Sequence, residues 1–432
     1  MSEEKTGKEN NSPKGQPDLN FLRYTSTAAL ANFVQPIFTL FVTLLALELG
    51  ADPLEIGLVG GASSFVYTFM PFVMGRFSDR GEARKFFIII SLALLSTVSI
   101  LYSFAQNPVI LILLRTTEGL GWAIFWPSID SAVTHDTKMD PRRALSIFNL
   151  SWSLTAALGP LVGSLVILVS SIRFVFVFDA LFLLAGLSVN LVTYFRGTGN
   201  SIRSSSSGAT NLPDGKTEEI VQTSASRVTP TAGTATRISP FFYVFSLVLC
   251  TIASSTLSSF LSPYAKSQGI PIFVIGAVAF TYGIMRFTGY LLTTSGSVRR
   301  FLLNDRTRTR NIMIALSIEA LSTLLMLIHD KSAVVYFISF GLVGLCYSVV
   351  YSVAMVAFLA ETSKEKMGLG AGIFENSIGI GAFAGPVVAG IISGNSLTVP
   401  FIVPSLSAIP ILSYLFFLSR SGRSAAKNQE NL

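Results

Sequence analysis

The sequence predicts an all-α integral membrane protein with twelve transmembrane helices in two six-helix, pseudo-symmetric bundles, and three observations lead to this fold class. Half of the 432 residues are apolar, only 13% are charged, and the mean hydropathy is +0.60. Soluble domains carry about 25% charged residues, which disfavours a water-soluble protein. Twelve apolar stretches reach the length of about 20 residues that crosses a bilayer, and the two halves of the chain share matching residues.

The predicted spans follow one another with polar or turn-rich breaks between them. The first half gives residues 27–49, 55–75, 86–105, 108–133, 144–170 and 173–195, and the second gives 241–264, 271–294, 311–329, 333–360, 369–393 and 399–419. Polar tails are expected at 1–26 and 420–432, around bundles at 27–195 and 241–419. Residues 196–240 are rich in Ser, Thr and Gly, which is typical of a flexible linker.

The positive charges indicate how the chain crosses the membrane. Of its 31 Lys and Arg residues, 26 fall in the tails, the linker and every second loop, whereas the opposite loops hold Arg173, Lys266 and Lys331. Basic loops stay on the cytoplasmic side, so we expect both termini and the linker in the cytoplasm of a multi-pass plasma-membrane protein. The net charge of +7 is thereby a topology signal, and no nucleic-acid partner is expected.

Several chemical classes lose support from the composition. Cys250 and Cys346 each lie in an apolar run, which gives no disulfide framework, and His135 and His329 cannot build a metal site alone. We expect no cofactor, no metal and no cleaved targeting segment. A membrane enzyme would need clustered nucleophiles, bases or metal ligands, so we expect no enzyme.

An internal repeat supports the division into two halves. The trio Gly50, Ile56 and Gly57 recurs at an offset of 219 residues, and the trio Phe148, Gly159 and Pro160 recurs at an offset of 226. The later copies are Gly269, Ile275, Gly276, Phe374, Gly385 and Pro386. Parallel repeats of six spans describe a known transporter architecture.

The loop after the second span carries the most specific motif. It reads GRFSDRGEARK from residue 75 and resembles the G-x-L-a-D-R-x-G-R-K signature of the major facilitator superfamily, with Gly75, Asp79 and Arg80 in place. The second glycine comes one residue early and the basic pair one late. The resemblance implies a gating role for Asp79, which would accept hydrogen bonds from the helix start near 368–370 and favour the outward-open state. A solvated loop without this role is the alternative.

The fourth span combines charges and aromatic rings on one helical face. Arg115, Glu118, Gly119 and Gly121 resemble the R-x-x-q-G-x-g motif of the same family. Helical spacing places Arg115 and Glu118 on one face with Trp122, Trp126 and Asp130. Because charges at membrane depth are expected to pair or to line water, we interpret this face as a substrate or proton site. A purely structural pair is the alternative, and Asp130 is assigned to the gate.

Other spans add weaker candidates. Span five contains Asn149 and Trp152 as candidate substrate contacts. Its Gly159 and Pro160, like Gly385 and Pro386 in span eleven, suit close packing and bending, and the GPxxG sequence partly resembles an antiporter motif. In span one, Asn32 and Gln35 belong to a polar stripe, although such groups also bond to their own helix.

Four further charges lie within spans. By resemblance, Arg286 and Glu375 lie near the central cavity, whereas Asp179 and Glu319 lie toward the periphery. A carboxylate such as Glu375 could take up and release a proton during transport, or it could bond a neighbouring helix.

These features predict a secondary active transporter of a small solute that works by alternating access. No P-loop is present, which makes protons the expected coupling ion, through Glu118 or Glu375. The aromatic face and the partial antiporter motif favour efflux of drug-like or amphipathic compounds. Uptake of a sugar or organic anion is the alternative, since Arg115 and Arg286 suit an anion, and a sensor or scaffold of the same fold remains open. We expect a monomer in the lipid bilayer.

Overall fold

The computed structural model describes residues 18–78, 81–204, 240–304, 307–328, 332–362 and 367–406, and every regular element in these ranges is helical. The first half contains α1 (Leu19–Glu48), α2 (Pro53–Ser78), α3 (Gly81–Ser103), α4 (Pro108–His135), α5 (Pro141–Val169) and α6 (Ile172–Ser204). The second half contains α7 (Pro240–Ser267), α8 (Ile272–Thr294), α9 (Gly296–Leu302), α10 (Arg308–Ile328), α11 (Ala333–Glu361), α12 (Met367–Ser393), the 3-10 turn η3 (Val399–Phe401) and α13 (Ile402–Leu406).

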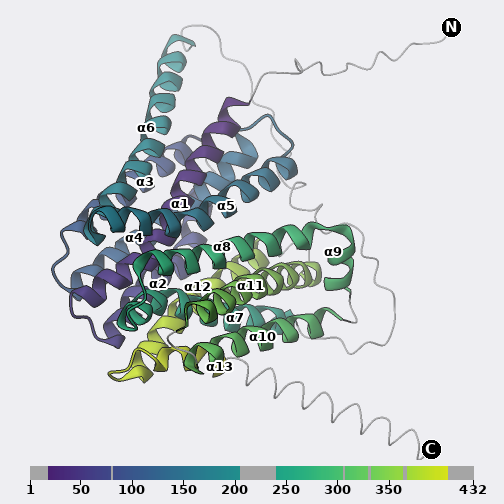
Figure 1. Ribbon diagram of the computed structural model, residues 1–432. Helices are drawn as coiled ribbons and strands as arrows, with labels where there is room; N and C mark the ends of the chain where they lie inside the picture. The colour runs from purple at the N-terminus through teal and green to yellow at the C-terminus, as the bar shows by residue number, and fades with distance from the viewer. Residues whose placement is uncertain are drawn as a thin grey trace, which may run out of the picture.

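The two halves form separate bundles that lie side by side. Helices α1 to α6, purple to teal in Figure 1, make one bundle, and the green to yellow helices of the second half make the other. Nine helices of the described part are long and apolar enough to cross a membrane. The predicted fold class is confirmed, and eleven predicted spans each correspond to one long helix.

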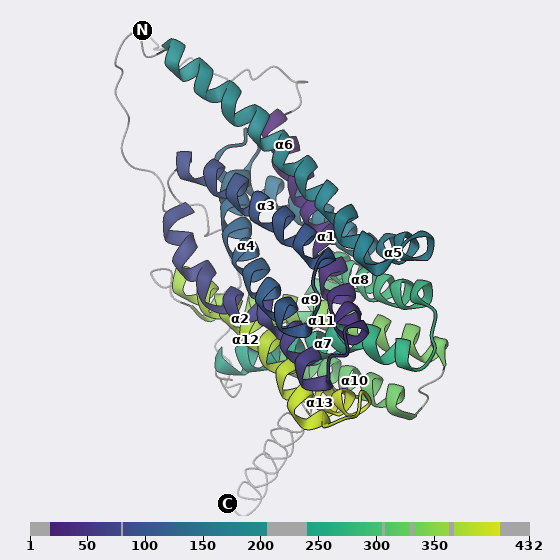
Figure 2. The ribbon, with the colours of Figure 1, turned by 90° about the vertical axis from the view of Figure 1, so that its left-hand side faces the viewer.

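Some boundaries differ from the prediction. Helix α1 begins at Leu19 because Asp18 caps it, accepting hydrogen bonds from the backbone N–H groups of Asn20 (3.1 Å) and Phe21 (3.2 Å). Helix α6 continues to Ser204, past its expected end at 195, and Figure 2 shows it projecting beyond its bundle. The short basic helix α9 was not expected. The span predicted at 399–419 is described only to Leu406.

The internal repeat is visible in the backbone. Gly50 and Gly269, which correspond at an offset of 219, have φ angles of 83° and 77° and follow the equivalent helices α1 and α7. Only glycine adopts this left-handed conformation readily, which explains why the same residue ends both helices.

Residues from the repeat also join the two bundles. A Cβ atom at Gly57 of α2 would collide with the Pro386 carbonyl oxygen of α12, and one at Gly276 of α8 would lie 2.6 Å from the Pro160 carbonyl oxygen of α5. Helices α2 and α12 accordingly run side by side (Figure 2). We call these two contacts, α2 with α12 and α5 with α8, the paired seams. Each seam combines a glycine from one trio with a proline from the other.

The paired seams lie toward one side of the membrane. We call the side where α1 begins the basic side, since the arginine-rich loops lie there, and the other the opposite side. Gly57 and Gly276 are near the opposite-side ends of α2 and α8. There the Thr43 hydroxyl of α1 also lies 3.2 Å from the Ser262 hydroxyl of α7. Close packing thus holds the bundles together on the opposite side.

Candidate functional site

Arg115 and Glu118 of α4 form a buried ion pair, as their spacing predicted. The Arg115 Nη1 atom lies 2.8 Å from both Glu118 carboxylate oxygens, and the two residues are only 4% and 1% exposed. The Arg115 Nε group donates to the Val59 carbonyl oxygen of α2 at 3.2 Å. Neither side chain is accessible to solvent, so in this conformation the pair does not line an open site, and removing one partner would leave the other charge buried and uncompensated.

Two further donors complete the surroundings of Glu118. The Tyr102 hydroxyl of α3 donates to Oε2 at 2.6 Å, and the Trp122 indole N–H donates to Oε1 at 2.9 Å. Trp122 is itself 1% exposed and stacks on Trp126 with ring centroids 6.3 Å apart. The sequence placed Trp122 on the substrate face, but the structure uses it as a donor to a buried carboxylate.

Arg286 of α8 has very different surroundings. Its side chain is half-buried, and among the described residues no carboxylate pairs with it. Its Nε group donates to the Tyr290 hydroxyl at 3.3 Å, and its guanidinium carbon lies 4.6 Å from the centre of the Tyr347 ring. The charge is therefore held by aromatic groups in place of an acid.

Tyrosine side chains extend this environment over two helices, and we call the group the Arg286 pocket. Tyr351 of α11 lies edge-on to Tyr290 (5.8 Å) and stacks with Tyr347 (6.2 Å). The members are Arg286, Tyr282, Tyr290, Tyr347 and Tyr351. Sequence analysis missed the tyrosines, although the steps of four residues from Tyr282 to Arg286 to Tyr290, and from Tyr347 to Tyr351, place each set on one helical face.

Two carboxylates are exposed on helices at the boundary between the bundles. Asp130 of α4 and Glu375 of α12 both have exposed side chains, and both lie within electrostatic range of Tyr67 on α2. Neither takes part in an ion pair within the described ranges. The role of Glu375 in proton coupling stays a prediction.

Other intramembrane polar residues differ in whether they find hydrogen-bond partners, and neither carboxylate oxygen of Asp179 has one within the described part of the chain. Asn32 is 3% exposed and donates to the Ala28 carbonyl oxygen at 3.3 Å, while Gln35 is half-buried. Asp179 is fully buried in α6, and Glu319 in α10 accepts a weak hydrogen bond from the Cys250 thiol at 3.5 Å. For Asn32 the structure favours the structural alternative, a bond back to its own helix.

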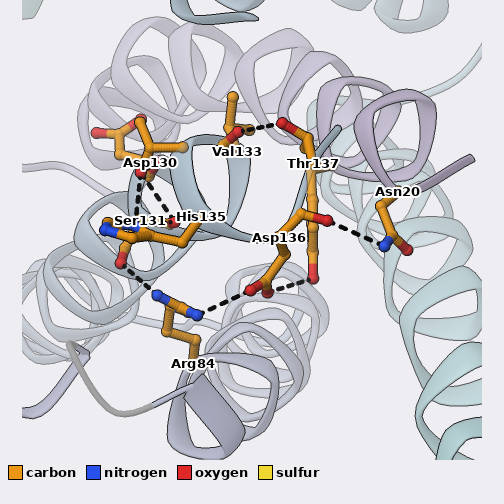
Figure 3. Close-up of polar contacts among 10 residues, drawn as sticks. Asn20, Arg84, Asp130, Ser131, Val133, His135, Asp136 and Thr137 are labelled. Carbon is orange, nitrogen blue, oxygen red and sulfur yellow. Dashed lines mark hydrogen bonds and ion pairs between the residues drawn. The ribbon is translucent and has the colours of Figure 1, made fainter. Parts of the chain in front are cut away.

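A polar cluster ties together the basic-side ends of α1, α3 and α4 (Figure 3). Arg84 of α3 pairs with Asp136 at 2.8 Å and donates to the Ser131 hydroxyl at 3.1 Å. From α1, the Tyr24 hydroxyl donates to the Asp136 carboxylate and Asn20 to its backbone carbonyl, both at 3.0 Å. The acid that holds Arg84 is Asp136, and the Asp130 carboxylate points away from Arg84 (Figure 3). The assignment of Asp130 to the gate stays a prediction.

Several predicted residues cannot be placed. Asp79 and Arg80 lie outside the described residues. For Gly75, Asn149 and Trp152 the structure describes only the helical backbone. By contrast, Gly159, Pro160, Gly385 and Pro386 all lie at close helix contacts. A Cβ at Gly385 would lie 2.6 Å from the Ile252 carbonyl oxygen of α7, and one at Gly159 would collide with the Phe33 carbonyl oxygen of α1. Their gating role stays a prediction.

The two helical bundles, the paired seams and the polar residues between them define a multi-pass membrane protein built like a solute transporter. The model of the Major Facilitator Superfamily matches residues 21–305 and 301–432, and the chain belongs to this family. The predicted family is thus confirmed. The search of the curated proteins gives no significant match.

Solved structures give the same fold at low sequence identity. The nucleoside transporter NupG is 15% identical, with 93% of this chain and 98% of that chain covered and a TM-score of 0.69. A bacterial homolog of the human lysosomal transporter Spinster, in an inward-facing and occupied conformation, is 15% identical over 93% and 96% with a TM-score of 0.66. PepTSo2 is 12% identical over 94% and 98%, with a TM-score of 0.63.

Proposed function

We propose that the protein is a proton-coupled secondary active transporter that moves a small solute through the plasma membrane by alternating access. It works as a monomer with both termini in the cytoplasm. The observation that carries this proposal is the arrangement of the paired seams. They hold the bundles together on the opposite side, while exposed polar residues lie between the bundles further toward the basic side.

The buried and the exposed charged residues are proposed to have different roles. The Arg115–Glu118 pair is closed to solvent in this conformation, so we assign proton exchange to the exposed carboxylates Glu375 and Asp130. A transport cycle would protonate these groups from one side and release the protons to the other as the bundles rock.

The structure also bears on the choice between amphipathic compounds and organic anions as the solute. The prediction that the protein exports amphipathic compounds depended on the tryptophan face of α4, yet Trp122 is buried against Glu118. Trp126 alone of the two described tryptophans keeps partial exposure. The alternative solute class, an organic anion, gains support from Arg286, which pairs with no acid in the part of the chain that the structure describes.

Flux measurements test the proposal. The purified full chain is reconstituted in vesicles that contain a pH indicator, and organic acids, drug-like amines and sugars are added in turn. Proton movement that depends on one compound, and is lost in Glu375→Gln, supports coupled transport, and its direction distinguishes antiport from symport. The Glu55→Gln variant, changed at a terminal turn of α2, is the matched control and should retain flux. Solute-dependent flux without proton movement would overturn the coupling, and absence of flux for every compound would favour a sensor or scaffold.

A further inference from the structure

Arg286 raises the question of which solute the transporter carries. We propose that the Arg286 pocket binds an organic anion, a carboxylate attached to an aromatic ring, and this inference rests on the transport function proposed above. Three features carry it, namely the free donors of Arg286, the tyrosine rings around it and the distribution of nearby charge.

The guanidinium keeps donors available for a ligand. Its Nε group is used by Tyr290, but no partner for the two terminal amino groups lies within the described part of the chain. The described buried polar atoms that lack a hydrogen bond do not include these two amino groups. Both amino groups are therefore accessible. A guanidinium fork matches the two oxygens of a carboxylate, which it binds with paired charge-assisted hydrogen bonds.

The depth of Arg286 strengthens the case for an anionic ligand. It lies eight residues before the end of α8, about 12 Å from that end at the helical rise of 1.5 Å per residue. A charge at membrane depth is costly unless it is paired or reaches water. Arg115 meets this requirement with Glu118, whereas Arg286 meets it through the accessible space that a solute would occupy.

The tyrosines specify the rest of the ligand. Tyr347 and Phe374 are buried, at 5% and 2% exposure, and pack against Tyr351 at 6.2 Å and 5.4 Å. The accessible aromatic surface beside the guanidinium therefore belongs to the half-buried rings of Tyr282, Tyr290 and Tyr351. A planar ring attached to the carboxylate would pack on these surfaces, because offset and edge-to-face aromatic contacts are favourable. The Tyr282 hydroxyl, on the same face of α8, offers a polar contact.

The charge pattern favours an anion over a cation. Two acids act electrostatically on the pocket, Glu375 on Tyr351 and Glu319 on Tyr282, yet neither forms an ion pair with Arg286. A cationic amine placed against the tyrosines would meet the positive guanidinium at close range, whereas a carboxylate there would neutralise it.

Equilibrium binding to the purified full chain in detergent tests this inference without any need for transport. The probes are benzoate, phenylacetate and 3-phenylpropanoate, together with the amide of each acid and the amine benzylamine. Titration calorimetry compares the wild type with Arg286→Gln, Arg286→Lys and the control Arg300→Gln, whose exposed arginine lies on α9 outside the pocket. We expect an acid to bind the wild type and Arg300→Gln alike. In Arg286→Gln its Kd should rise by about tenfold or more, the usual effect of losing a charge-assisted hydrogen bond.

The controls keep the inference falsifiable. Arg286→Lys, which keeps the charge without the fork, should bind with intermediate affinity, and it serves if Arg286→Gln does not fold. Equal binding of the acids to the wild type and to Arg286→Gln would overturn the inference, as would tighter binding of the amides or the amine, or no binding of any acid. Coupled flux of a different solute would then leave the proposed function standing. Binding without flux would overturn the proposed function and not the anion site.

Discussion

Arg115 and Arg286 are both arginines inside membrane helices, one in each half of the molecule, and their surroundings are opposite. Arg115 is 4% exposed and pairs with Glu118 at 2.8 Å, while Arg286 is half-buried beside tyrosines and pairs with no acid in the described residues. For both arginines the high free-energy cost of a charge at membrane depth has to be offset. The first offsets it within the protein, and the second leaves its charge available to a ligand.

The difference shows that an intramembrane charge is not by itself evidence of a transport site. The deciding property is whether other protein groups already use all the hydrogen-bonding capacity of the charged side chain. Glu118 receives donors from Arg115, Tyr102 and Trp122, so it has no capacity left for a solute. The terminal amino groups of Arg286 have such capacity, and each prediction below breaks or sharpens this contrast.

The largest effect is expected for Glu118→Leu. This change leaves Arg115 buried without its partner and removes the acceptor of two further donors, which costs about 3–5 kcal/mol in unfolding free energy. Thermal unfolding in detergent measures the loss. Glu375→Gln, at an exposed position, is the matched carboxylate control and should change stability by about 0.5 kcal/mol or less. A Glu118→Leu protein as stable as Glu375→Gln would contradict the structural role of the pair.

The two arginines themselves give the next largest contrast. Arg115→Met should destabilise the protein by about 3 kcal/mol, because the Glu118 carboxylate stays buried without a cation. Arg286→Met breaks no ion pair among the described residues, so the stability of this variant should remain within about 1 kcal/mol of the wild type while solute binding is lost. Denaturation and binding are measured on the same preparations. Similar destabilisation by both substitutions would remove the contrast.

The sequence predicted one side of this comparison better than the other. The three-residue spacing of Arg115 and Glu118 was sufficient to expect their pairing, because both partners lie on one helix. The Arg286 pocket joins α8 to α11, and the Arg84 cluster joins α1, α3 and α4. Side chains on different helices meet only through packing, which spacing along one helix cannot supply. The fold class could be predicted because span length and the repeated glycines can be recognised in the sequence without knowing how the helices pack.

The paired seams hold the opposite side closed, which gives a third prediction. Gly57→Val should weaken the α2–α12 seam by about 1–3 kcal/mol, since the added carbons collide with the Pro386 carbonyl group. The opposite side should then open more often. In a Ser259→Cys background, a membrane-impermeant thiol reagent added from that side should react faster, because the native Cys250 and Cys346 are buried.

A matched glycine variant controls this experiment. Gly296→Ala adds a Cβ atom that meets nothing within 4 Å and should leave the labelling rate unchanged. Equal labelling of the Gly57→Val and wild-type seams would show that this contact does not hold the opposite side closed.

The smallest effect is expected at the basic-side cluster, where the ion pair is less buried than Arg115–Glu118 and its acid keeps another donor. Arg84→Gln should cost about 1–2 kcal/mol, because the side chains of Arg84 and Asp136 keep 8% and 16% exposure and Tyr24 still bonds the acid. The rate of hydrogen exchange at the start of α1 and after α4 should rise, while binding of an organic anion at Arg286 should stay unchanged. An effect as large as that of Arg115→Met would mean that burial does not separate the two ion pairs.

The hydroxyl contact between Thr43 and Ser262 has a geometric consequence. These residues correspond to each other at the offset of 219, so the axis that relates the two halves passes between them. The paired seams lie on either side of this axis and use equivalent glycines and prolines. If the opposite side opens as proposed, similar resistance from the two seams would balance the torque about the axis. The bundles would then rotate symmetrically instead of tilting toward the weaker contact.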